Sequence, residues 1–493
     1  MSRLFIAVEL GEERGRVMLG TLHKDRLTVS EVHRFENVPV REKGSVLWDV
    51  GQLYQDTLVG LREVGNYDEP VDSISCSAWA ADYLLFHSDA SFIPPTYHFR
   101  STRTDEGRKE VLSRVLWQTI CEETGVPALH QSTLFQLGAE KPRHLRRADH
   151  LLPVADGFNF LLSGVPWTEM SSASATQLFN PMSRTWSDRL IAALELPAKL
   201  LPTVVPGGTK LRALRPEIAK AIRLDDAHVV ASCSNELAAA LVGLPVQEDE
   251  NFAFMRLGRN AVVGTQMTEP VISDASRDAG ISHTIGYQGA VYCHAETVGV
   301  RILEECRHFW AESEHALDEC ALAHLAATAE AHVSLVNLAD PRFATPGDVV
   351  AKIQAYCRET DQLAPRRPGA VYRCLMESLA FLYRKTLDDL AQATGREFTS
   401  LHLMGESKDN ILHHFIANAL QLPVVIAPTE ATAIGNVVVQ AIAMGRIGSL
   451  SEARQIVQQS FKTATIQPSP AATWAPVYER FLELSGTRMA VPA

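Results

Sequence analysis

The sequence predicts an α/β protein of two domains, and three observations lead to this fold class. The chain has 493 residues, more than one hydrophobic core usually serves, so two or three domains are expected. Short apolar runs alternate with amphipathic helical patterns, which is typical of α/β proteins. A strand–turn–strand pattern near the start of the chain occurs again near its middle.

The repeated pattern covers residues 4–20 (LFIAVELGEERGRVMLG) and residues 251–267 (NFAFMRLGRNAVVGTQM). Each copy has an apolar strand, a charged residue followed by Leu-Gly, a short polar turn and a returning apolar strand. The copies begin the two halves of the chain, a spacing that indicates duplication. The segment 243–251 between the halves contains Gly, Pro and an acidic run. We therefore predict domains at 1–245 and 246–493.

Further strands and helices are predicted after each hairpin. In the first half, buried strands are expected at Ser73–Cys76 and Val229–Ser232. In the second half, the clearest helix covers Ala370–Thr394, with leucines along one face and charged residues along the other. A βαβα segment follows, with a strand at 401–405, a helix at 411–420, a strand at 423–428 and a helix that begins within 429–436. Because ligands of open α/β sheets gather at the carboxyl ends of strands, the loops 405–410 and 428–432 are candidate site loops, or else simple connections.

Composition excludes several classes of protein. A formal net charge of −12 argues against a nucleic-acid-binding surface, which would need a clustered basic face. The eight cysteines form no CxxC pair and are expected to be buried or free thiols of a reducing compartment. The first apolar run is short and reaches Glu9 at once, which is unlike a signal peptide, and no apolar run approaches the roughly 18 residues that a membrane span needs. We expect a cytoplasmic protein that binds neither nucleic acid nor membrane.

The first hairpin turn, AVELGEERGR at 7–16, raises a chemical question. A Gly-containing turn between two strands presents backbone N–H groups that can bind a phosphate. Yet this turn carries the carboxylates of Glu9, Glu12 and Glu13. Even at an effective dielectric constant of about 20, one pair of like charges at 4 Å costs about 4 kcal/mol. Arg14 and Arg16 are placed to offset that repulsion.

Ten short segments, taken in order, resemble the FGGY carbohydrate kinases, and within that family the rhamnulokinases. They are AVELGEERGRVMLG (7–20), WDV (48–50), AWAAD (78–82), FRSTRT (99–104), STLFQL (132–137), TQLFN (176–180), ADPRFATP (339–346), CRET (357–360), ESLAFLYRKTLDDLA (377–391) and PTEATAIGN (428–436). The resemblance runs almost from end to end. It implies two actin-like (ribonuclease-H-like) domains, each a mixed sheet flanked by helices, with a cleft between them.

The resemblance also implies a reaction. FGGY kinases transfer the γ-phosphoryl group of ATP, with Mg²⁺, to a sugar hydroxyl, and for a rhamnulokinase the sugar is the ketose L-rhamnulose. This chemistry needs positioning, neutralisation of the phosphates and a carboxylate that accepts the hydroxyl proton. The implied partners are a small sugar and a nucleotide, and we expect a monomer or a homodimer.

Residues on the sugar side match the family's pattern in part. The segment SNEL places Glu236 at the position of the catalytic base, where the family has Asp, and Asn235 at a substrate-binding position. Glu236 could also be a carboxylate favoured by the dipole in the first turn of a helix. Trp79, Ala80 and Asp82 occupy the family's sugar-binding Trp-x-x-Asp pattern. Trp79 is suited to stack on a sugar, and core packing is its alternative role.

Residues on the nucleotide side depart further from the pattern. Glu9 replaces an Asp implied to bind the metal, and the first phosphate turn is implied to contain Gly11, Glu12, Glu13, Arg14, Gly15 and Arg16. In the second half, the implied nucleotide-binding residues are Gly258, Arg259, Glu296 and Gly405. Arg259 stands where the family has a Thr that contacts ATP, and Gly405 is followed by Glu406 and Ser407 in place of two glycines.

Two hypotheses about activity follow. The first is a working kinase that phosphorylates a ketose with MgATP and uses Glu236 as its base. The second is a catalytically degenerate pseudokinase that binds a sugar or a partner without turning over ATP, suggested by the substitutions in both phosphate turns. A kinase with another phosphoryl donor is a third possibility.

Overall fold

The computed structural model describes residues 2–127, 131–247, 249–311, 317–405 and 410–486. Contacts divide the chain into two units. The first contains Met1–Glu248, Gln266–Cys293 and Glu430–Lys462, and the second contains Asp249–Thr265, His294–Thr429 and Thr463–Ala493. The first limit, after Glu248, lies close to the predicted boundary at 245/246, and two later segments of the chain belong to the first unit as well. The hydrophobic pattern of the sequence does not indicate that either of these segments belongs to the first unit.

The main sheet of the first unit has six strands in the order β15-β16-β6-β1-β2-β3. These are β1 (Arg3–Leu10), β2 (Arg14–His23), β3 (Arg26–Glu36), β6 (Val71–Ala78), β15 (Thr209–Ala213) and β16 (His228–Ala231). β1 pairs antiparallel with β2, as the hairpin pattern predicts, and parallel with β6, which is parallel to β16. Both strands predicted in this half are thus confirmed.

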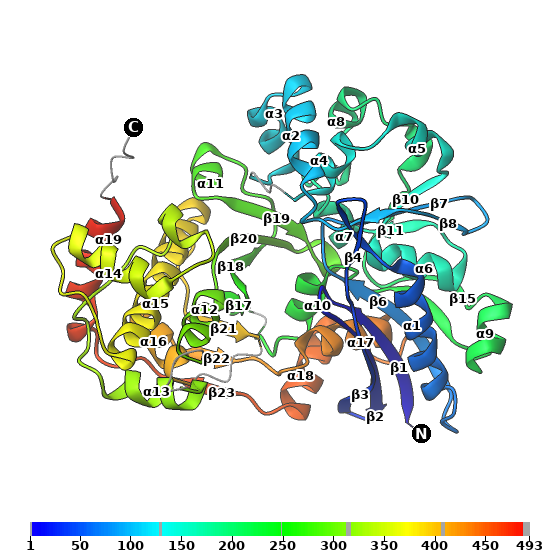
Figure 1. The fold of residues 1–493 in the computed structure, drawn as a ribbon. Helices are drawn as coiled ribbons and strands as arrows, with labels where there is room; N and C mark the ends of the chain where they lie inside the picture. Colours follow the sequence, from blue (N-terminus) through cyan, green and yellow to red (C-terminus); the bar gives the residue numbers. More distant parts are fainter. Residues whose placement is uncertain (1, 128–130, 248, 312–316, 406–409, 487–493) are drawn as a thin grey trace. The chain divides into compact units, whose positions relative to one another are not determined.

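Helices cover both faces of this sheet. They are α1 (Val50–Val64), α6 (Val154–Ser163), α10 (Glu236–Val242) and α17 (Ala431–Ala443). Figure 1 shows α1 and α17 on opposite sides of β1 and β6. Leu4, Ile6 and Val8 of β1 belong to one buried core with side chains of α1 and α6. On the other face, Gln440 of α17 donates to the Ile6 carbonyl at 2.9 Å.

The first unit contains further short elements around this sheet. The strands are β4 (Val40–Glu42), β5 (Ser45–Trp48), β7 (Tyr83–Phe86), β8 (Phe92–Ile93), β9 (Thr96–Tyr97), β10 (His150–Pro153), β11 (Trp167–Glu169), β12 (Phe179–Asn180), β13 (Thr185–Trp186), β14 (Thr203–Val205) and β19 (Ile281–Ile285). The helices are α2 (Arg103–Arg114), α3 (Trp117–Thr124), α4 (Thr133–Gly138), α5 (Pro142–Arg147), α7 (Met170–Ser174), α8 (Asp188–Ala193), α9 (Pro216–Ile222), α11 (Asp274–Asp278), α18 (Leu450–Ser460) and the 3₁₀ turns η1 (Ala198–Leu200) and η2 (Tyr287–Gly289). A second buried core, which includes Leu134, Phe135 and Leu151, lies under α2–α5 and α8.

The sheet of the second unit repeats the same strand pairing. Its strand order is β19-β20-β18-β17-β21-β22-β23. Besides β19, the strands are β17 (Phe252–Leu257), β18 (Asn260–Met267), β20 (Val291–Val298), β21 (Ser400–Met404), β22 (Val424–Ile426) and β23 (Ala464–Ile466), and the limits of the unit fall inside β18 and β20. β17 pairs antiparallel with β18 and parallel with β21, which is parallel to β22. In both units, therefore, an N-terminal hairpin is followed by two parallel strands, and the last of these pairs with an antiparallel edge strand. The repeated topology agrees with the duplication that the sequence indicates.

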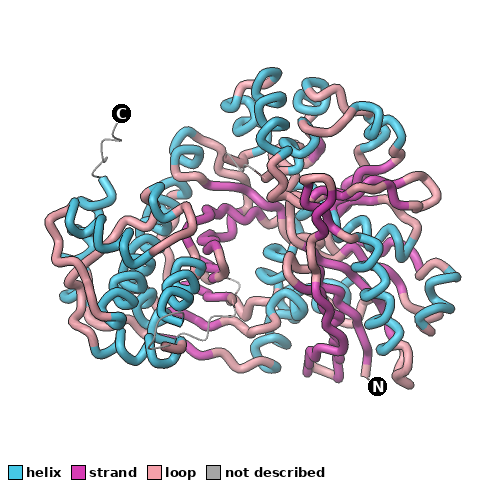
Figure 2. The backbone as a smooth tube through the Cα atoms, viewed as in Figure 1, coloured by secondary structure: helices cyan, strands magenta, loops and turns pink. Residues whose placement is uncertain are grey.

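Helices of the second unit gather around one long helix. They are α12 (Arg301–Ala311), α13 (Glu319–Thr328), α14 (Val349–Glu359), α15 (Pro368–Thr394), α16 (Asn410–Leu420), α19 (Ala475–Gly486) and the 3₁₀ turns η3 (Pro341–Phe343) and η4 (Ala471–Thr473). α15 confirms the predicted helix; it begins with Pro at its first turn and ends at Gly395, whose φ is 66°. α12, α13, α16 and α19 pack against α15, and Figure 2 shows these helices beside the strands of this unit.

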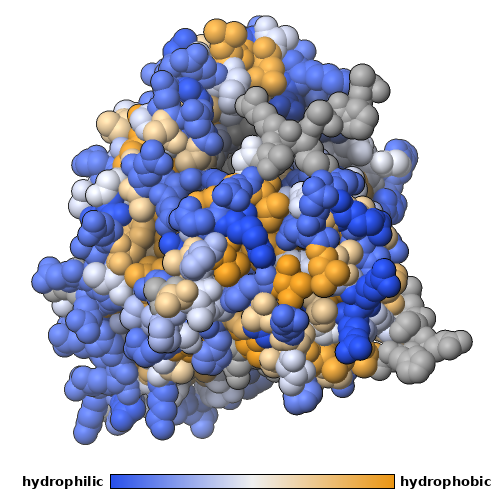
Figure 3. All heavy atoms as spheres, turned by 90° about the vertical axis from the view of Figure 1, so that its left-hand side faces the viewer, coloured by the Kyte–Doolittle hydropathy of each residue, from blue (hydrophilic) through white to orange (hydrophobic). Residues whose placement is uncertain are grey.

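The surface is mixed in character. Figure 3 shows one face of the molecule, on which hydrophobic groups lie among hydrophilic ones. Seven of the eight cysteines are buried, as expected, and Cys320 is exposed. Within the described parts of the chain, the helices are all too short or too polar to span a bilayer.

Candidate active site

Three neighbouring strands of the first unit end at one edge of its sheet and bring the predicted residues together. Along β1 and β6, Glu9 lies opposite Ser77 and Leu10 opposite Ala78. The Ala78 N–H donates to the Ser234 carbonyl at 2.9 Å, and this bond joins the end of β6 to the turn before α10. Glu236 is the first residue of α10. Glu9, Trp79 and Glu236 thus lie at the carboxyl ends of adjacent parallel strands, where ligands of such sheets bind.

Asn235 caps the helix that begins with Glu236. Its Oδ1 accepts hydrogen bonds from the N–H groups of Leu237 (3.0 Å) and Ala238 (3.3 Å). This is a regular N-cap arrangement and it fixes the first turn of α10. The cap occupies the Oδ1 atom of Asn235, the residue predicted to bind substrate. Glu236, half-buried, is placed at the rim of the strand ends by that capped turn.

Glu9 forms a buried ion pair with Arg16 of the neighbouring strand. Arg16 Nη2 donates to Glu9 Oε2 at 2.6 Å, and only 8 % of Glu9 is exposed. Burial raises the pKa of Glu9 to about 7, even though the nearby Arg16 charge lowers it. The charges of Glu430 and Glu236 raise it further, so both carboxylates are close enough to Glu9 to affect its protonation.

Arg16 holds three carboxylates at once. Its guanidinium lies 2.8 Å from Glu430 Oε2, just before α17, and 3.8 Å from Glu31 Oε2 on β3, in addition to the contact with Glu9. A guanidinium is suited to such multiple pairing because its donors form a rigid planar fork. The sequence predicts Arg16 as a phosphate ligand; the structure shows its donors directed at carboxylates of its own unit. Glu430 was missed as a partner, although it lies in the predicted site loop 428–432.

Glu9 retains one oxygen that fits a metal ion. Glu9 Oε1 is buried and has no hydrogen-bond partner among the described residues. Mg²⁺ binds through one or two carboxylates plus substrate phosphates and waters, so a single free carboxylate oxygen suits it. No cluster of three or more metal-binding side chains occurs in the described parts of the chain. The donor set therefore fits a Mg²⁺ ion held mainly by the phosphates of a nucleotide.

The turn of the first hairpin is tight and its acidic side chains lie on the surface. The Gly11 N–H donates to the Arg14 carbonyl at 2.9 Å, and a Cβ on Gly11 would lie 2.7 Å from that oxygen. Glu12 pairs with Arg100 at 2.9 Å in an exposed ion pair, and Glu13 is exposed. The repulsion expected from Glu12 is thus partly offset by Arg100 rather than by Arg14 alone.

Gly15 has a packing role. A Cβ at this position would lie 2.2 Å from the ring of Phe35 on β3. The glycine therefore lets β2 and β3 pack at this point, next to the Arg16 ion pairs. Its predicted contact with phosphate is not needed to explain why a glycine stands there.

Asp82 organises the aromatic side chains of the predicted sugar site. Its Oδ2 accepts from Trp48 Nε1 at 2.5 Å and from Trp79 Nε1 at 2.9 Å, and its Oδ1 accepts from Gln136 Nε2 at 2.8 Å. Burial raises the pKa of Asp82 to about 6, against the lowering effect of these hydrogen bonds. Trp79 is only 5 % exposed and belongs to the main core, which agrees with its alternative role in packing. Ala80, in contrast, is exposed at the end of β6.

Sequence reasoning did not assign Trp48 and Gln136 to this site. The Trp48 ring reaches Asp82 from 34 residues away along the chain, and the Gln136 amide reaches it from 54 residues away. Both segments, WDV and STLFQL, are among those that carry the family resemblance, so a signal was present. What it lacked was the pairing with Asp82, which needs the three-dimensional structure.

The predicted nucleotide residues of the second unit lie around the turn of its hairpin. The Val300 N–H donates to the Gly258 carbonyl at 2.9 Å, and a Cβ on Gly299 would lie 2.1 Å from that oxygen. A Cβ on Gly405, whose φ is 130°, would lie 2.2 Å from the Leu257 carbonyl. Gly258, Gly299 and Gly405 therefore form a cradle in which backbone segments approach too closely for a side chain. Glu406 and Ser407 lie outside the described residues.

Arg259 and Glu296 have partners next to this cradle. Arg259 Nη1 donates to Glu304 Oε2 on α12 at 3.2 Å, and Glu296 accepts a hydrogen bond from Asn260 Nδ2.

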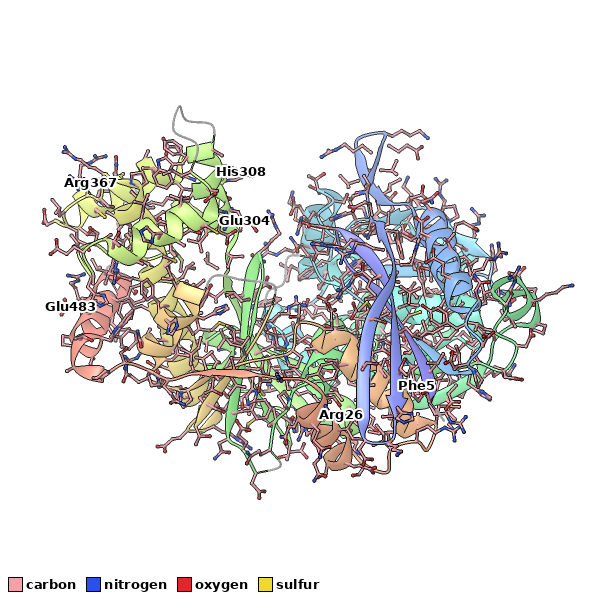
Figure 4. All side chains as sticks on the ribbon, turned by 90° about the horizontal axis from the view of Figure 1, so that it is seen from below. Phe5, Arg26, Glu304, His308, Arg367 and Glu483 are labelled. Carbon is pink, nitrogen blue, oxygen red and sulfur yellow. The ribbon has the colours of Figure 1, made fainter. Side chains whose placement is uncertain are left out.

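In Figure 4, Glu304 and His308 lie on the same helix, α12, and Arg367 lies apart from them. Arg367 lines a cavity of about 1090 Å³ between α13, α14 and α15. That cavity is lined by none of the four predicted nucleotide residues and is separate from the cradle.

This fold, with a carboxylate pair at the strand ends of one unit and a glycine cradle in the other, belongs to a known class of sugar-phosphorylating enzymes. The model of the N-terminal domain of the FGGY family of carbohydrate kinases matches residues 5–243, and the model of its C-terminal domain matches residues 253–444. The chain therefore belongs to the FGGY family of carbohydrate kinases. The fold class predicted from the sequence is confirmed.

Comparison with individual proteins shows which members of the family the chain resembles. A rhamnulokinase from Bacteroides thetaiotaomicron is 31% identical over 98% of this chain and 99% of its own length, and one from Enterococcus faecalis is 30% identical over 98% of both. Among solved structures, gluconate kinase from Lactobacillus acidophilus has a TM-score of 0.83 at 15% identity, with 98% of each chain covered. Plasmodium falciparum glycerol kinase with ADP has a TM-score of 0.81 at 13% identity, covering 100% of this chain and 99% of that one. These structures show the shared fold.

Proposed function

We propose that this chain transfers the γ-phosphoryl group of ATP to a hydroxyl of a ketose, and that L-rhamnulose is its preferred sugar. The kinase family and the full-length rhamnulokinase relatives support the proposal. The observation that carries it is the placement of Glu236 at the strand ends, within electrostatic reach of the buried Glu9. A carboxylate for the proton and a second one for the metal are the two groups that this chemistry requires from the protein.

Glu236 accepts the proton of the sugar hydroxyl in this proposal. The hydroxyl oxygen forms a bond to the γ-phosphorus, the bond between that phosphorus and the bridging oxygen to ADP breaks, and ADP leaves with the electron pair. Glu236 is the first residue of α10 and half-buried, so its carboxylate lies at the strand ends, where the sugar hydroxyl would bind. Because Glu has one more methylene than the Asp of the family pattern, the sugar must bind about 1 Å further from the backbone than in a relative with Asp.

Glu9 and the phosphates of ATP would hold Mg²⁺, which when bound neutralises the charge that the phosphates develop. The chain's own contribution is to keep Glu9 Oε1 unpaired while Arg16 engages Oε2. Arg16 thereby aims the free oxygen of Glu9 and prevents the carboxylate from rotating. The glycine cradle around Gly258 and Gly405 is suited to the nucleotide.

A coupled assay of ADP formation tests the substrate. The purified protein is given MgATP and, in turn, L-rhamnulose, L-fuculose, D-xylulose, L-ribulose, glycerol and D-gluconate. We expect the highest kcat/KM for L-rhamnulose. A higher value for D-gluconate or glycerol would assign the enzyme to another substrate class of the same family.

Calorimetric titration with MgATP separates the kinase from an inactive binding protein on the same scaffold. A kinase is expected to bind MgATP with a Kd in the micromolar to millimolar range, as is usual for substrates at physiological concentration. If MgATP does not bind and L-rhamnulose does, the substituted phosphate turns have closed the nucleotide site. Titration with MgGTP and pyrophosphate in the same experiment identifies another phosphoryl donor.

A further inference from the structure

Two buried carboxyl groups in the first unit take no part in the proposed reaction. Asp156 lies in the first turn of α6, and Glu169 is the last residue of β11. Only 1 % of Asp156 and 0 % of Glu169 is exposed. Burying a carboxyl group costs free energy unless its oxygens are hydrogen-bonded, so their contacts show what they stabilise.

Both carboxyl groups bind the turn that leads to Glu236. Glu169 Oε2 accepts hydrogen bonds from the Ser234 N–H at 2.9 Å and from the Ser171 hydroxyl. The Ser171 oxygen in turn accepts from the Asn235 N–H at 3.0 Å. Asp156 Oδ1 accepts from the Ser234 hydroxyl at 2.7 Å. One carboxylate oxygen of Glu169 thus restrains two successive backbone N–H groups, one directly and one through a hydroxyl.

The remaining backbone groups of this turn are also paired. The Ser234 carbonyl accepts from Ala78, and the Asn235 carbonyl accepts from Ala239 in the first turn of α10. The turn from β16 to α10 is therefore held from β6, from β11 and from α7, which carries Ser171. The position of the Glu236 Cα atom follows from this network, because Glu236 is the next residue along the chain.

We propose that Glu169, acting through Ser171, is a positioning residue for Glu236 in the phosphoryl transfer. The proposal rests on the kinase function proposed above and deepens it. A general base must lie within hydrogen-bond reach of the proton that it accepts, and a displacement of about 1 Å can cost about 10²-fold in rate. Glu169 and Ser171 set that distance although neither side chain reaches the reacting atoms.

The hydrogen-bond pattern predicts which substitutions are tolerated. Glu169 uses one oxygen as a double acceptor, and its Oε1 has no partner among the described residues. Glu169→Gln can keep its carbonyl oxygen at the Oε2 position and place the amide nitrogen at the Oε1 position. Glu169→Leu has a similar volume and no acceptor. The first variant is therefore expected to preserve the turn and the second to release it.

Steady-state kinetics with L-rhamnulose and MgATP test the proposal. Glu169→Leu is expected to lower kcat about 100-fold and Ser171→Ala about 10-fold, with both KM values within threefold of the parent. Glu169→Gln is expected to retain kcat within threefold. The matched control is Glu377→Leu in the second unit, which also removes a buried carboxylate that accepts from a backbone N–H, that of His332 at 3.0 Å. The control is expected to keep kcat at temperatures where it is folded.

Amide hydrogen exchange gives a second readout that does not depend on turnover. Exchange at Ser234 and Asn235 is expected to be slow in the parent and in Glu169→Gln, and at least tenfold faster in Glu169→Leu. Equal kcat and equal exchange in the parent and in Glu169→Leu would overturn the proposal. If the parent phosphorylates no sugar, the kinase function fails and the catalytic role of Glu169 fails with it, whereas the exchange result still shows whether Glu169 holds the turn.

Discussion

Around Arg16, three carboxylates share one guanidinium, and a fourth carboxylate, Glu236, lies close enough to act on one of them. Glu9, Glu31 and Glu430 contact Arg16 directly, and Glu236 acts on Glu9 through its charge. Glu31 is exposed and also pairs with Arg34, so the excess of negative charge is that of Glu9, Glu430 and Glu236. Such an excess attracts cations. The acidic first hairpin, puzzling as a phosphate turn, is thus explained in part: Glu9 pairs with Arg16 and is the residue that we propose as the metal ligand, and Glu12 pairs with Arg100 instead.

The raised pKa of Glu169 predicts how the stability of the protein changes with pH. Burial raises its pKa to about 7, from 4.5 in an exposed chain. The folded state therefore binds this proton more tightly than the unfolded state, and the resulting stabilisation is full below pH 4.5 and is lost as the pH rises through 7. Glu169→Gln has no such proton to lose.

We accordingly expect Glu169→Gln to become more stable relative to the parent as the pH rises from 5 to 8. The difference in the free energy of unfolding between the variant and the parent is expected to change by roughly 3 kcal/mol at most over this pH range, as the size of the pKa shift implies. Urea unfolding of both proteins at pH 5, 6, 7 and 8 measures it. A difference that is constant across this range would mean that Glu169 is ionised throughout or is exposed to water.

Helices α10 and α17 of the first unit cross at glycines, and this crossing fixes the positions of Glu236 and Glu430. A Cβ on Gly435 of α17 would lie 1.8 Å from the Ala239 carbonyl of α10. A Cβ on Gly243, just after α10, would lie 2.2 Å from the Ala431 carbonyl. α10 begins with Glu236 and α17 follows Glu430, so the close approach of these helices sets where both carboxylates stand.

Gly435→Ala is expected to push α17 away from α10. Because the added methyl group meets backbone, which cannot rotate aside, we expect a loss of about 3 kcal/mol in the free energy of unfolding and a fall in kcat. Thermal unfolding and the ADP assay measure these effects. Gly51→Ala is the control, since its Cβ would meet only Asp49 Oδ1 at an ordinary 3.5 Å. Equal unfolding temperatures for the two variants would show that α17 is not tightly packed on α10.

At the scale of the whole molecule, the chain order and the structural units do not coincide. α17 comes late in the sequence, yet Gln440 accepts from the Ser73 hydroxyl at 2.7 Å and donates to the Ile6 carbonyl of the first sheet. Val437 occupies the space above Gly20 of β2. The first sheet would lack the cover of one face without this returning segment.

A fragment of residues 1–245 is therefore expected not to fold to a unique structure by itself. We expect weak near-UV circular dichroism and strong binding of an apolar dye, as in a molten globule. Joining residues 430–462 to the fragment through a Gly/Ser linker is expected to raise its stability, whereas joining residues 475–486 is not. A cooperative, fully folded 1–245 fragment would show that the sequence halves are independent domains.

More of the fold than of the candidate site could be predicted from the sequence. Both hairpins, the strands at 71–78 and 228–231 and the helix at 368–394 follow from local apolar patterns, which act over short distances. The return of 430–462 to the first unit is a long-range event with no local signature. In the candidate site, the family resemblance suggested Glu9, Asp82 and Glu236. It did not suggest their partners Trp48, Gln136 and Glu430, because a motif names residue types and not the contacts between distant segments.

The central claim is that Glu236 is the general base of a ketose kinase. It is tested most directly by comparing the parent with Glu236→Gln, an isosteric change that removes the proton acceptor, in ADP formation from MgATP and L-rhamnulose. We predict that kcat falls by about 10²–10⁴-fold while calorimetric binding of MgATP is retained. Turnover of Glu236→Gln at the parental rate would contradict the claim.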